Sequence, residues 1–190
     1  MNDTIEHKII ISPMGDHDTD LLDTIGKEVK RLFGFPVERK KLVNNVDFAF
    51  DTKREQYYST PILEKLALKA TPDTSRILAI TDIDLFIPIL TFVYGEAQLG
   101  GTSCIISTCR LTKDLSAETS KDIFYSRVIK EAIHELGHTF KLLHCKDPSC
   151  IMHYCRSIKD VDQKSDQLCR YCKILLDDEK KRLLKKISGS

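Results

Sequence analysis

The sequence predicts an α+β fold in which helices pack on a mixed, twisted sheet. Its 190 residues are enough for one domain with a sizeable apolar core. Hydrophobic residues make up 42% of the chain and charged residues 30%, which is typical of globular and not of disordered proteins. Strand and helix patterns alternate in the first half, and helix patterns dominate the second half. Because there is no internal repeat or linker, we expect a single domain over residues 1–190.

The first half alternates between extended runs and amphipathic stretches. Apolar residues recur at helical spacing from Thr19 to Phe33, and Gly34 and Pro36 end that helix. Ser59-Thr60-Pro61 is typical of a helix start, because a hydroxyl can cap the helix and proline suits its first turn. β-Branched and other apolar residues predict extended segments over residues 8–12, 37–43 and 46–50.

The second half contains a hairpin and two longer helices. Leu99-Gly100-Gly101 separates two strand-like runs and predicts a tight turn between them. A long helix is expected from Thr119 to Leu142, and a basic amphipathic helix with a solvated face from Cys172 to Ile187. The predicted strands of this half cover residues 76–86, 91–98 and 102–108.

Charge and apolar content argue against several classes of partner. Twenty-nine basic and 28 acidic side chains leave a net charge of +1, which gives no field to attract nucleic acid or an anionic membrane. The first eight residues are polar, and the most apolar stretch, Leu85 to Tyr94, contains Pro88. We therefore expect a cytoplasmic protein, a monomer without membrane or nucleic-acid partners. Its seven cysteines then need a purpose other than disulfides.

The strongest functional motif is His134-Glu135-Leu136-Gly137-His138 within the long predicted helix. Histidines four residues apart lie on one helix face, so both imidazoles can reach one metal ion. Glu135 projects about 100° around the helix from His134, which places a carboxylate beside the metal without making it a ligand. The alternative is a partly exposed helix with incidental histidines.

His144 follows six residues after His138 and is the third candidate ligand. It cannot lie on the same straight helical face, so the helix must end and the chain must turn back. Three nitrogen ligands leave the fourth zinc position open, and an open position separates catalytic zinc from structural zinc. The spacing therefore predicts a catalytic zinc site.

A second candidate metal site follows directly. Its four cysteines, two with Cys-x4-Cys spacing and two with Cys-x2-Cys spacing, could fill a zinc tetrahedron and make a structural site. They are Cys145, Cys150, Cys169 and Cys172. We thus expect two Zn²⁺ ions per chain and a zinc-stabilised segment over residues 145–172. The alternatives are four unrelated buried cysteines or a nucleic-acid zinc module, and the dispersed basic residues disfavour the latter. Cys104, Cys109 and Cys155 are expected to be small buried hydrophobes.

These motifs, together with four further segments, resemble the archaemetzincins, a family of metzincin zinc metallopeptidases. The further segments are Pro13 to Asp16, Arg54 to Tyr57, Thr81 to Leu85 and Gly95 to Gly101, so the resemblance covers most of the chain. It implies a metzincin-like fold in which Met152 occupies a tight turn beneath the metal. It also implies that an edge strand, here Val93 to Gln98, binds the substrate as an added antiparallel strand. Glu96 on that strand is expected to be a solvated charge.

Two residues depart from the family pattern. Lys141 stands where most archaemetzincins have the glycine that breaks the helix, so a positive φ there would cost about 1 kcal/mol. Alternatively, the helix ends differently and His144 is misplaced. Tyr154, two residues after the turn methionine, resembles the astacin branch, where such a tyrosine can stabilise the oxyanion. Otherwise it is a half-buried aromatic beside the cysteines.

The sequence therefore predicts a zinc-dependent peptidase acting on peptides or proteins. The metal would acidify a bound water and polarise the scissile carbonyl, and Glu135 would accept the proton of that water. The alternative, suggested by Lys141, is an inactive or restricted relative that binds zinc and peptide without cleavage.

Overall fold

The computed structural model describes residues 6–115 and 120–188, with side chains up to residue 185. Part of the polar amino terminus (residues 1–5) and the expected helix start at Thr119 lie outside the described residues. Within this range no helix is both long and apolar enough to cross a membrane.

The main sheet has five strands in the order β2-β1-β5-β8-β7. Their bounds are β1 Lys8–Met14, β2 Val37–Arg39, β5 Thr74–Thr81, β7 Gly95–Ala97 and β8 Ser103–Ser107. The first four strands in spatial order are parallel, and β7 pairs antiparallel with β8 as an edge strand. The prediction of a mixed sheet with helices packed on it is confirmed, and so is the hairpin that ends in β8.

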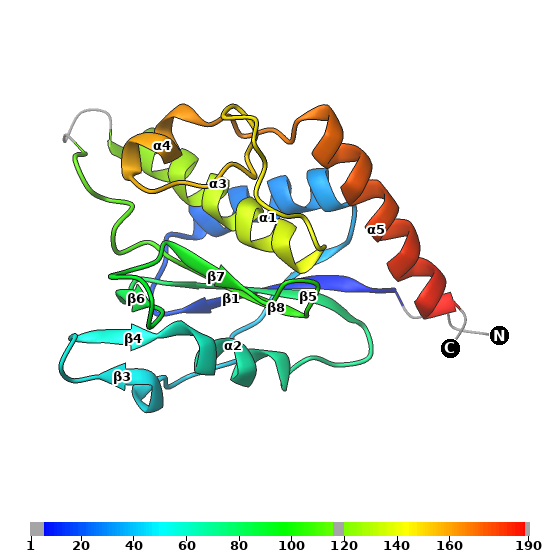
Figure 1. Cartoon of the computed structure of the whole chain (residues 1–190). Helices are drawn as coiled ribbons and strands as arrows, with labels where there is room; N and C mark the ends of the chain where they lie inside the picture. The colour runs from blue at the N-terminus through cyan, green and yellow to red at the C-terminus, as the bar shows by residue number, and fades with distance from the viewer. Residues whose placement is uncertain (1–5, 116–119, 189–190) are drawn as a thin grey trace.

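Both faces of this sheet are buried, and alternate residues of each central strand enter two different cores. On β1, Ile9 and Ile11 pack beneath helices α1 and α3, whereas Ile10 faces helix α2. Helices α1 (Thr19–Phe33), α3 (Ser120–Thr139), α4 (Ile158–Gln163) and α5 (Arg170–Ser188) lie on one side, and α2 (Ser59–Ala67) on the other (Figure 1). Burial on both faces explains why these strands are continuous apolar runs.

A second, three-stranded sheet was not expected from the sequence. It comprises β3 (Phe50–Asp51), β4 (Gln56–Tyr58) and β6 (Leu85–Phe86), in the order β3-β4-β6. The single strand predicted over residues 76–86 is therefore wrong. The chain leaves the main sheet after Thr81, where the Asp84 carboxylate binds Arg110 and Gln56, and then pairs with β4.

Some predicted element boundaries differ from the observed ones. Most of the expected strand 46–50 is a 3-10 helix at Asp47–Ala49. The long helix ends at Thr139, three residues before Leu142. Helix α4 was missed, although Ser157 and Asp160 form a capping box at its start.

The sequence suggested that the Ser59 hydroxyl caps α2, but in the structure it does not. Tyr58 is the N-cap, and it makes no side-chain capping bond. The Ser59 hydroxyl instead donates to the Phe86 carbonyl and to Glu96 Oε2, at 3.1 and 2.5 Å. Thr60 donates to the other Glu96 oxygen at 2.7 Å. Glu96 is thus a carboxylate that fastens edge strand β7 to the start of α2, and its expected role as a solvated charge is wrong.

Candidate active site

Helix α3 presents His134 and His138 one turn apart, with their rings oriented by the backbone. His134 Nδ1 donates to the Ile151 carbonyl at 2.9 Å, and His138 Nδ1 donates to the Leu142 carbonyl at 2.7 Å. Because both Nδ1 atoms carry the proton, both Nε2 atoms carry a lone pair. The two Nε2 atoms lie 3.1 Å apart and converge on one point.

The end of α3 turns the chain back so that His144 joins the pair. Leu142 N–H bonds to the Gly137 carbonyl and Lys141 N–H to the His138 carbonyl, the pattern of a Schellman motif with Lys141 in the left-handed position. Lys141 has φ 62°, so the helix ends in the strained left-handed turn. The alternative, a helix that ends differently and misplaces His144, is not what the structure shows. The His144 ring lies 5.3 Å from that of His134 and 4.9 Å from that of His138.

The three imidazoles suit a divalent cation. Two lone pairs facing each other at 3.1 Å repel unless a positive charge lies between them. Two nitrogens of a tetrahedral zinc site are separated by about 3.3 Å, which agrees with this distance. Burial lowers the pKa of His134 well below its ordinary value and that of His138 to about 4, so both are neutral and able to ligate. His144 is exposed, which leaves one side of the cluster accessible.

Glu135 is buried beside this cluster and lies against the edge strand. A Cβ atom at Gly95 would come within 2.6 Å of Glu135 Cγ, so only glycine allows β7 to approach the helix this closely. Burial, followed by the charge of Glu131, raises the pKa of Glu135 well above its ordinary value. A carboxylate with a raised pKa is a stronger base than a solvated one.

Met152 lies directly beneath the histidine helix. Its side chain is fully buried, and a Cβ at Gly137 would come within 2.6 Å of its sulfur. The glycine inside the His-Glu-x-x-His motif therefore makes space for the thioether. The backbone around Met152 is tied to the cysteine segment, since its carbonyl accepts from Cys145 N–H at 2.9 Å.

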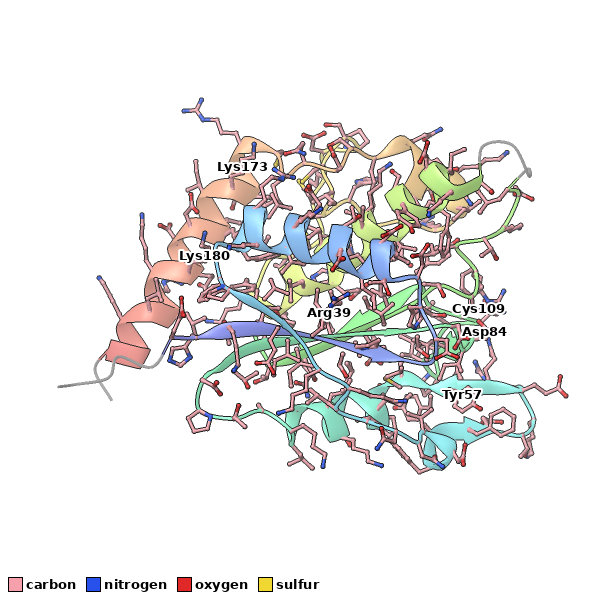
Figure 2. All side chains as sticks on the ribbon, turned by 180° about the vertical axis from the view of Figure 1, so that it is seen from behind. Arg39, Tyr57, Asp84, Cys109, Lys173 and Lys180 are labelled. Carbon is pink, nitrogen blue, oxygen red and sulfur yellow. The ribbon has the colours of Figure 1, made fainter. Side chains whose placement is uncertain are left out.

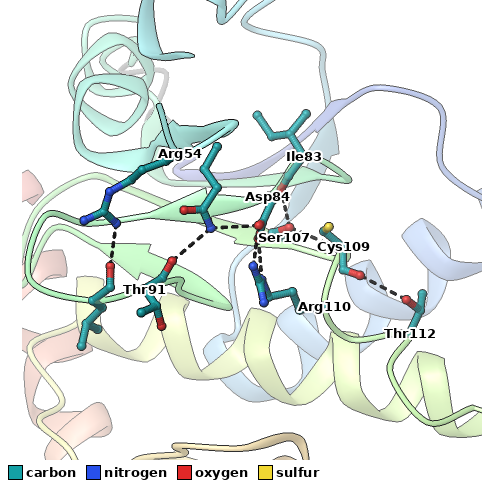
Figure 3. Close-up of polar contacts among 10 residues, drawn as sticks. Arg54, Ile83, Asp84, Thr91, Ser107, Cys109, Arg110 and Thr112 are labelled. Carbon is teal, nitrogen blue, oxygen red and sulfur yellow. Dashed lines mark hydrogen bonds and ion pairs between the residues drawn. The ribbon is translucent and has the colours of Figure 1, made fainter. Parts of the chain in front are cut away.

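A cleft of about 440 Å³ opens over the histidines. One wall is the segment from residue 87 to β7, and the other is formed by α3 and the residues after Met152. Tyr154 lines this cleft with its ring centroid 4.9 Å from that of His144. The first wall is anchored by Gln56, which donates to Asp84 and to the Thr91 carbonyl. Arg110 in turn donates to Asp84 with two bonds of 2.7 Å, as Figure 3 shows.

The cleft also contains an ion pair that the sequence did not indicate. Lys164 Nζ lies 2.8 Å from Glu131 Oε1, and the two side chains are 0% and 4% exposed. Burial acts to lower the pKa of Lys164, but the charge of Glu131 together with those of Cys155 and Glu135 raises this pKa above its ordinary value. Glu131 sits one turn before Glu135 on α3, but no pattern in the sequence connects Lys164 with it.

The four motif cysteines form a second cluster behind the first. Their sulfurs lie within 4.8 Å of one another, and Cys145 Sγ is 3.7 Å from Cys169 Sγ. Two sulfurs of a tetrahedral zinc site are about 3.8 Å apart, whereas a disulfide requires about 2 Å. Although burial opposes it, hydrogen bonds from Cys172 N–H and the neighbouring thiols lower the pKa of Cys169. Burial raises the pKa of Cys150 and of Cys172, so without a metal the cluster favours a single thiolate. The donor set and spacing fit zinc.

The remaining cysteines only partly match the expectation of buried hydrophobes. Cys104 is fully buried, as predicted. Cys109 is exposed at the end of the sheet near Asp84, as Figure 2 shows from behind. Cys155 is half-buried and lines the cleft, because the chain after Met152 forms its wall.

Comparison with known proteins agrees with this geometry. Residues 7–178 match the model of peptidase family M54. The archaemetzincin of Methanocaldococcus jannaschii is 35% identical over 173 residues, which cover 90% of this chain and 93% of the relative. The crystal structure of the Methanopyrus kandleri archaemetzincin superposes with a TM-score of 0.83 at 31% identity, covering 95% of this chain and 98% of that one. The Archaeoglobus fulgidus structure gives 0.75 at 30% identity, covering 88% and 99%. This chain belongs to peptidase family M54, the archaemetzincins, and is a zinc metallopeptidase.

Proposed function

We propose that His134, His138 and His144 hold the catalytic zinc and that Glu135 is the general base for peptide hydrolysis. The observation that carries this proposal is the convergence of two Nε2 lone pairs, 3.1 Å apart, on a point beside a buried carboxylate. Zinc bound there supplies a Lewis acid that acidifies water and polarises the scissile carbonyl. Glu135 accepts the proton of the attacking water and passes it to the leaving amine.

The peptide substrate binds along β7. As the edge strand of the main sheet, β7 can pair through its free backbone groups with an extended peptide. Gly95 supports this role, because it brings the strand next to Glu135 and so brings a paired peptide to the base.

Tyr154 stabilises the negative charge that develops on the carbonyl oxygen. Its ring packs near His144 at the open side of the cluster, where a phenol can donate to that oxygen. We expect Tyr154→Phe to lower kcat about tenfold to a hundredfold with little change in KM, because the bond forms in the transition state. Steady-state kinetics check this, and unchanged turnover would assign the ring to packing alone.

The cysteine cluster holds a second, structural zinc, so that each chain binds two ions. Four sulfur donors complete a tetrahedron and leave no position for substrate. We further propose that the chain is one monomeric domain of the cytoplasm without a nucleic-acid partner. Its seven free cysteines and near-neutral charge support that proposal.

The assignment of Glu135 is tested by Glu135→Ala and Glu135→Gln. Both variants should keep full zinc content by elemental analysis and lose peptide cleavage by about 10²- to 10⁴-fold, because only the proton acceptor is removed. Turnover close to that of the wild type in a zinc-loaded variant would show that Glu135 is not the base.

A further inference from the structure

The two ends of the cleft can be distinguished by the direction of β7. Gly100, just beyond β7, donates its N–H to the His138 carbonyl at 2.9 Å, so the strand ends beside the end of α3. Tyr94, just before β7, lines the cleft together with Glu131, one turn before the histidines. A peptide antiparallel to β7 therefore runs from the Gly100 end toward the Tyr94 end. This reasoning rests on the proposed function, and it places the residues after the scissile bond near Tyr94.

That end of the cleft carries cationic side chains. Lys164 and Arg156 line it, and the adjoining hollow, which shares Phe92, Tyr94 and Arg156 with the cleft, adds Lys113 and Lys159. The acidic residues that line this end and the hollow are Glu131 and Asp114.

Arg110 also lines the hollow, but its guanidinium is already paired with the Asp84 carboxylate. Its guanidinium makes two bonds to Asp84 (Figure 3) and lies 4.2 Å from the centroid of the Phe92 ring. Arg110 thus shapes the wall of the cleft. Arg156, Lys113 and Lys159, by contrast, pair with no carboxylate among the residues that the structure describes.

Lys164 connects these exposed cations with the catalytic centre. Its ammonium is fully buried, has the Glu131 carboxylate at 2.8 Å, and makes no contact of hydrogen-bond geometry with the described residues. An ammonium has three donors, and a single carboxylate oxygen does not use them all.

We infer that the cleft beyond Tyr94 binds carboxylate groups that follow the scissile bond. Guanidinium and ammonium groups form their strongest hydrogen bonds with carboxylates, and these bonds strengthen where water is excluded. The carboxylate can come from Asp or Glu side chains or from the free C-terminus of a short peptide. Preferred substrates are thus acidic on the leaving-group side of the bond.

The test compares three quenched fluorescent peptides that share one degenerate sequence before the cleavage site. After this site the first is neutral and amidated, the second contains Glu residues and is amidated, and the third is neutral and short with a free carboxylate. The wild type should cleave the second or third with a kcat/KM about tenfold above that of the first, and 0.5 M salt should reduce this advantage. The better of the two identifies the source of the carboxylate.

The matched variants are Arg156→Glu with Lys159→Glu, and Lys173→Glu as control. The pair should abolish the preference or reverse it, by about tenfold, whereas Lys173, exposed on α5 behind the molecule (Figure 2), should leave it unchanged. Lys164 is kept, because its removal would leave Glu131 buried without a partner. Equal kcat/KM for all three peptides, or an unchanged preference in the double variant, would overturn the inference.

Binding separates this inference from the proposed catalytic roles. Fluorescence anisotropy with labelled neutral and acidic peptides on the zinc-loaded Glu135→Gln variant reads the preference without turnover. Tighter binding of the acidic peptide, lost in the charge-reversed variant, supports the inference even if the assignment of the base is wrong. Equal binding rejects the inference and leaves that assignment standing.

Discussion

The histidine and cysteine clusters adjoin each other in the chain but are built in opposite ways. The histidine cluster offers three donors at the wall of the cleft, from buried His134 to exposed His144. The cysteine cluster offers four donors, drawn from the segment before Met152 and from the start of α5, and none of these four residues lines the cleft. The number of protein donors and their access to the cleft thus distinguish a centre suited to reaction from one suited to holding the chain together.

The two clusters also depend on each other. Cys145 N–H bonds to the Met152 carbonyl, and Ile151, whose carbonyl orients His134, donates its own N–H to Gln167 in the second half of the cysteine segment. Loss of the cysteine cluster should therefore disturb the histidine cluster, whereas loss of the histidine cluster should leave the cysteine cluster intact.

The largest effect is expected from Cys172→Ser. Removing one of four thiolates should release one zinc and lower the melting temperature by about 10 °C or more, because metal binding contributes directly to folding. Activity should fall as well, since the segment carrying Met152 is no longer fixed. Circular dichroism on heating and elemental analysis measure these effects.

His138→Ala is the matched comparison. It should also release one zinc and abolish cleavage, but lower the melting temperature by less than Cys172→Ser does, because His134 and His138 stand on one helix whereas the cysteines join two separate segments. If His138→Ala unfolds the chain while Cys172→Ser leaves a stable, active enzyme, the assigned roles of the two clusters are reversed.

An intermediate effect is expected from Gly137→Ala, which acts on the contact between the clusters. The new Cβ would lie 2.6 Å from the Met152 sulfur, so we expect a loss of about 1–3 kcal/mol of stability and reduced cleavage. Urea unfolding measures the first and peptide hydrolysis the second.

Gly26→Ala in α1 is the control for this substitution. A Cβ there meets Val37 at an ordinary 3.7 Å, so the gain in helix propensity should stabilise the protein by up to about 1 kcal/mol. Similar responses of the two helical glycines would show that the close contact with Met152 has no energetic importance.

The smallest effect is expected at Lys141, which ends the histidine helix. Lys141→Gly should relieve about 1 kcal/mol of left-handed strain, partly offset by the lost ion pair with Glu179 at 3.1 Å. Lys141→Ala keeps the strain and loses the same pair. The glycine variant should therefore unfold at a higher urea concentration than the alanine variant, and equal midpoints would show that the turn is not strained.

Local patterns in the sequence were enough for several features. The bounds of α1 were predicted correctly, because an apolar stripe and Gly34 mark the helix within a single segment. The spacing of His134 and His138 required only helix geometry to place both rings on one face. The cysteine spacing likewise pointed to four donors that the structure brings together.

Other features depend on contacts between distant segments. The sequence could not indicate that Glu96 bonds to Ser59, that Gly95 makes space for Glu135, or that Lys164 pairs with Glu131. It also misplaced residues 82–86, because only the tertiary structure gives β6 its partner in β4. Hydrogen bonding and side-chain periodicity within a helix are set by neighbours in the chain, so the sequence alone determined the identity and spacing of the candidate metal ligands. The walls, charges and close approaches of the cleft are set by which surfaces pack against each other, and only the folded chain decided these.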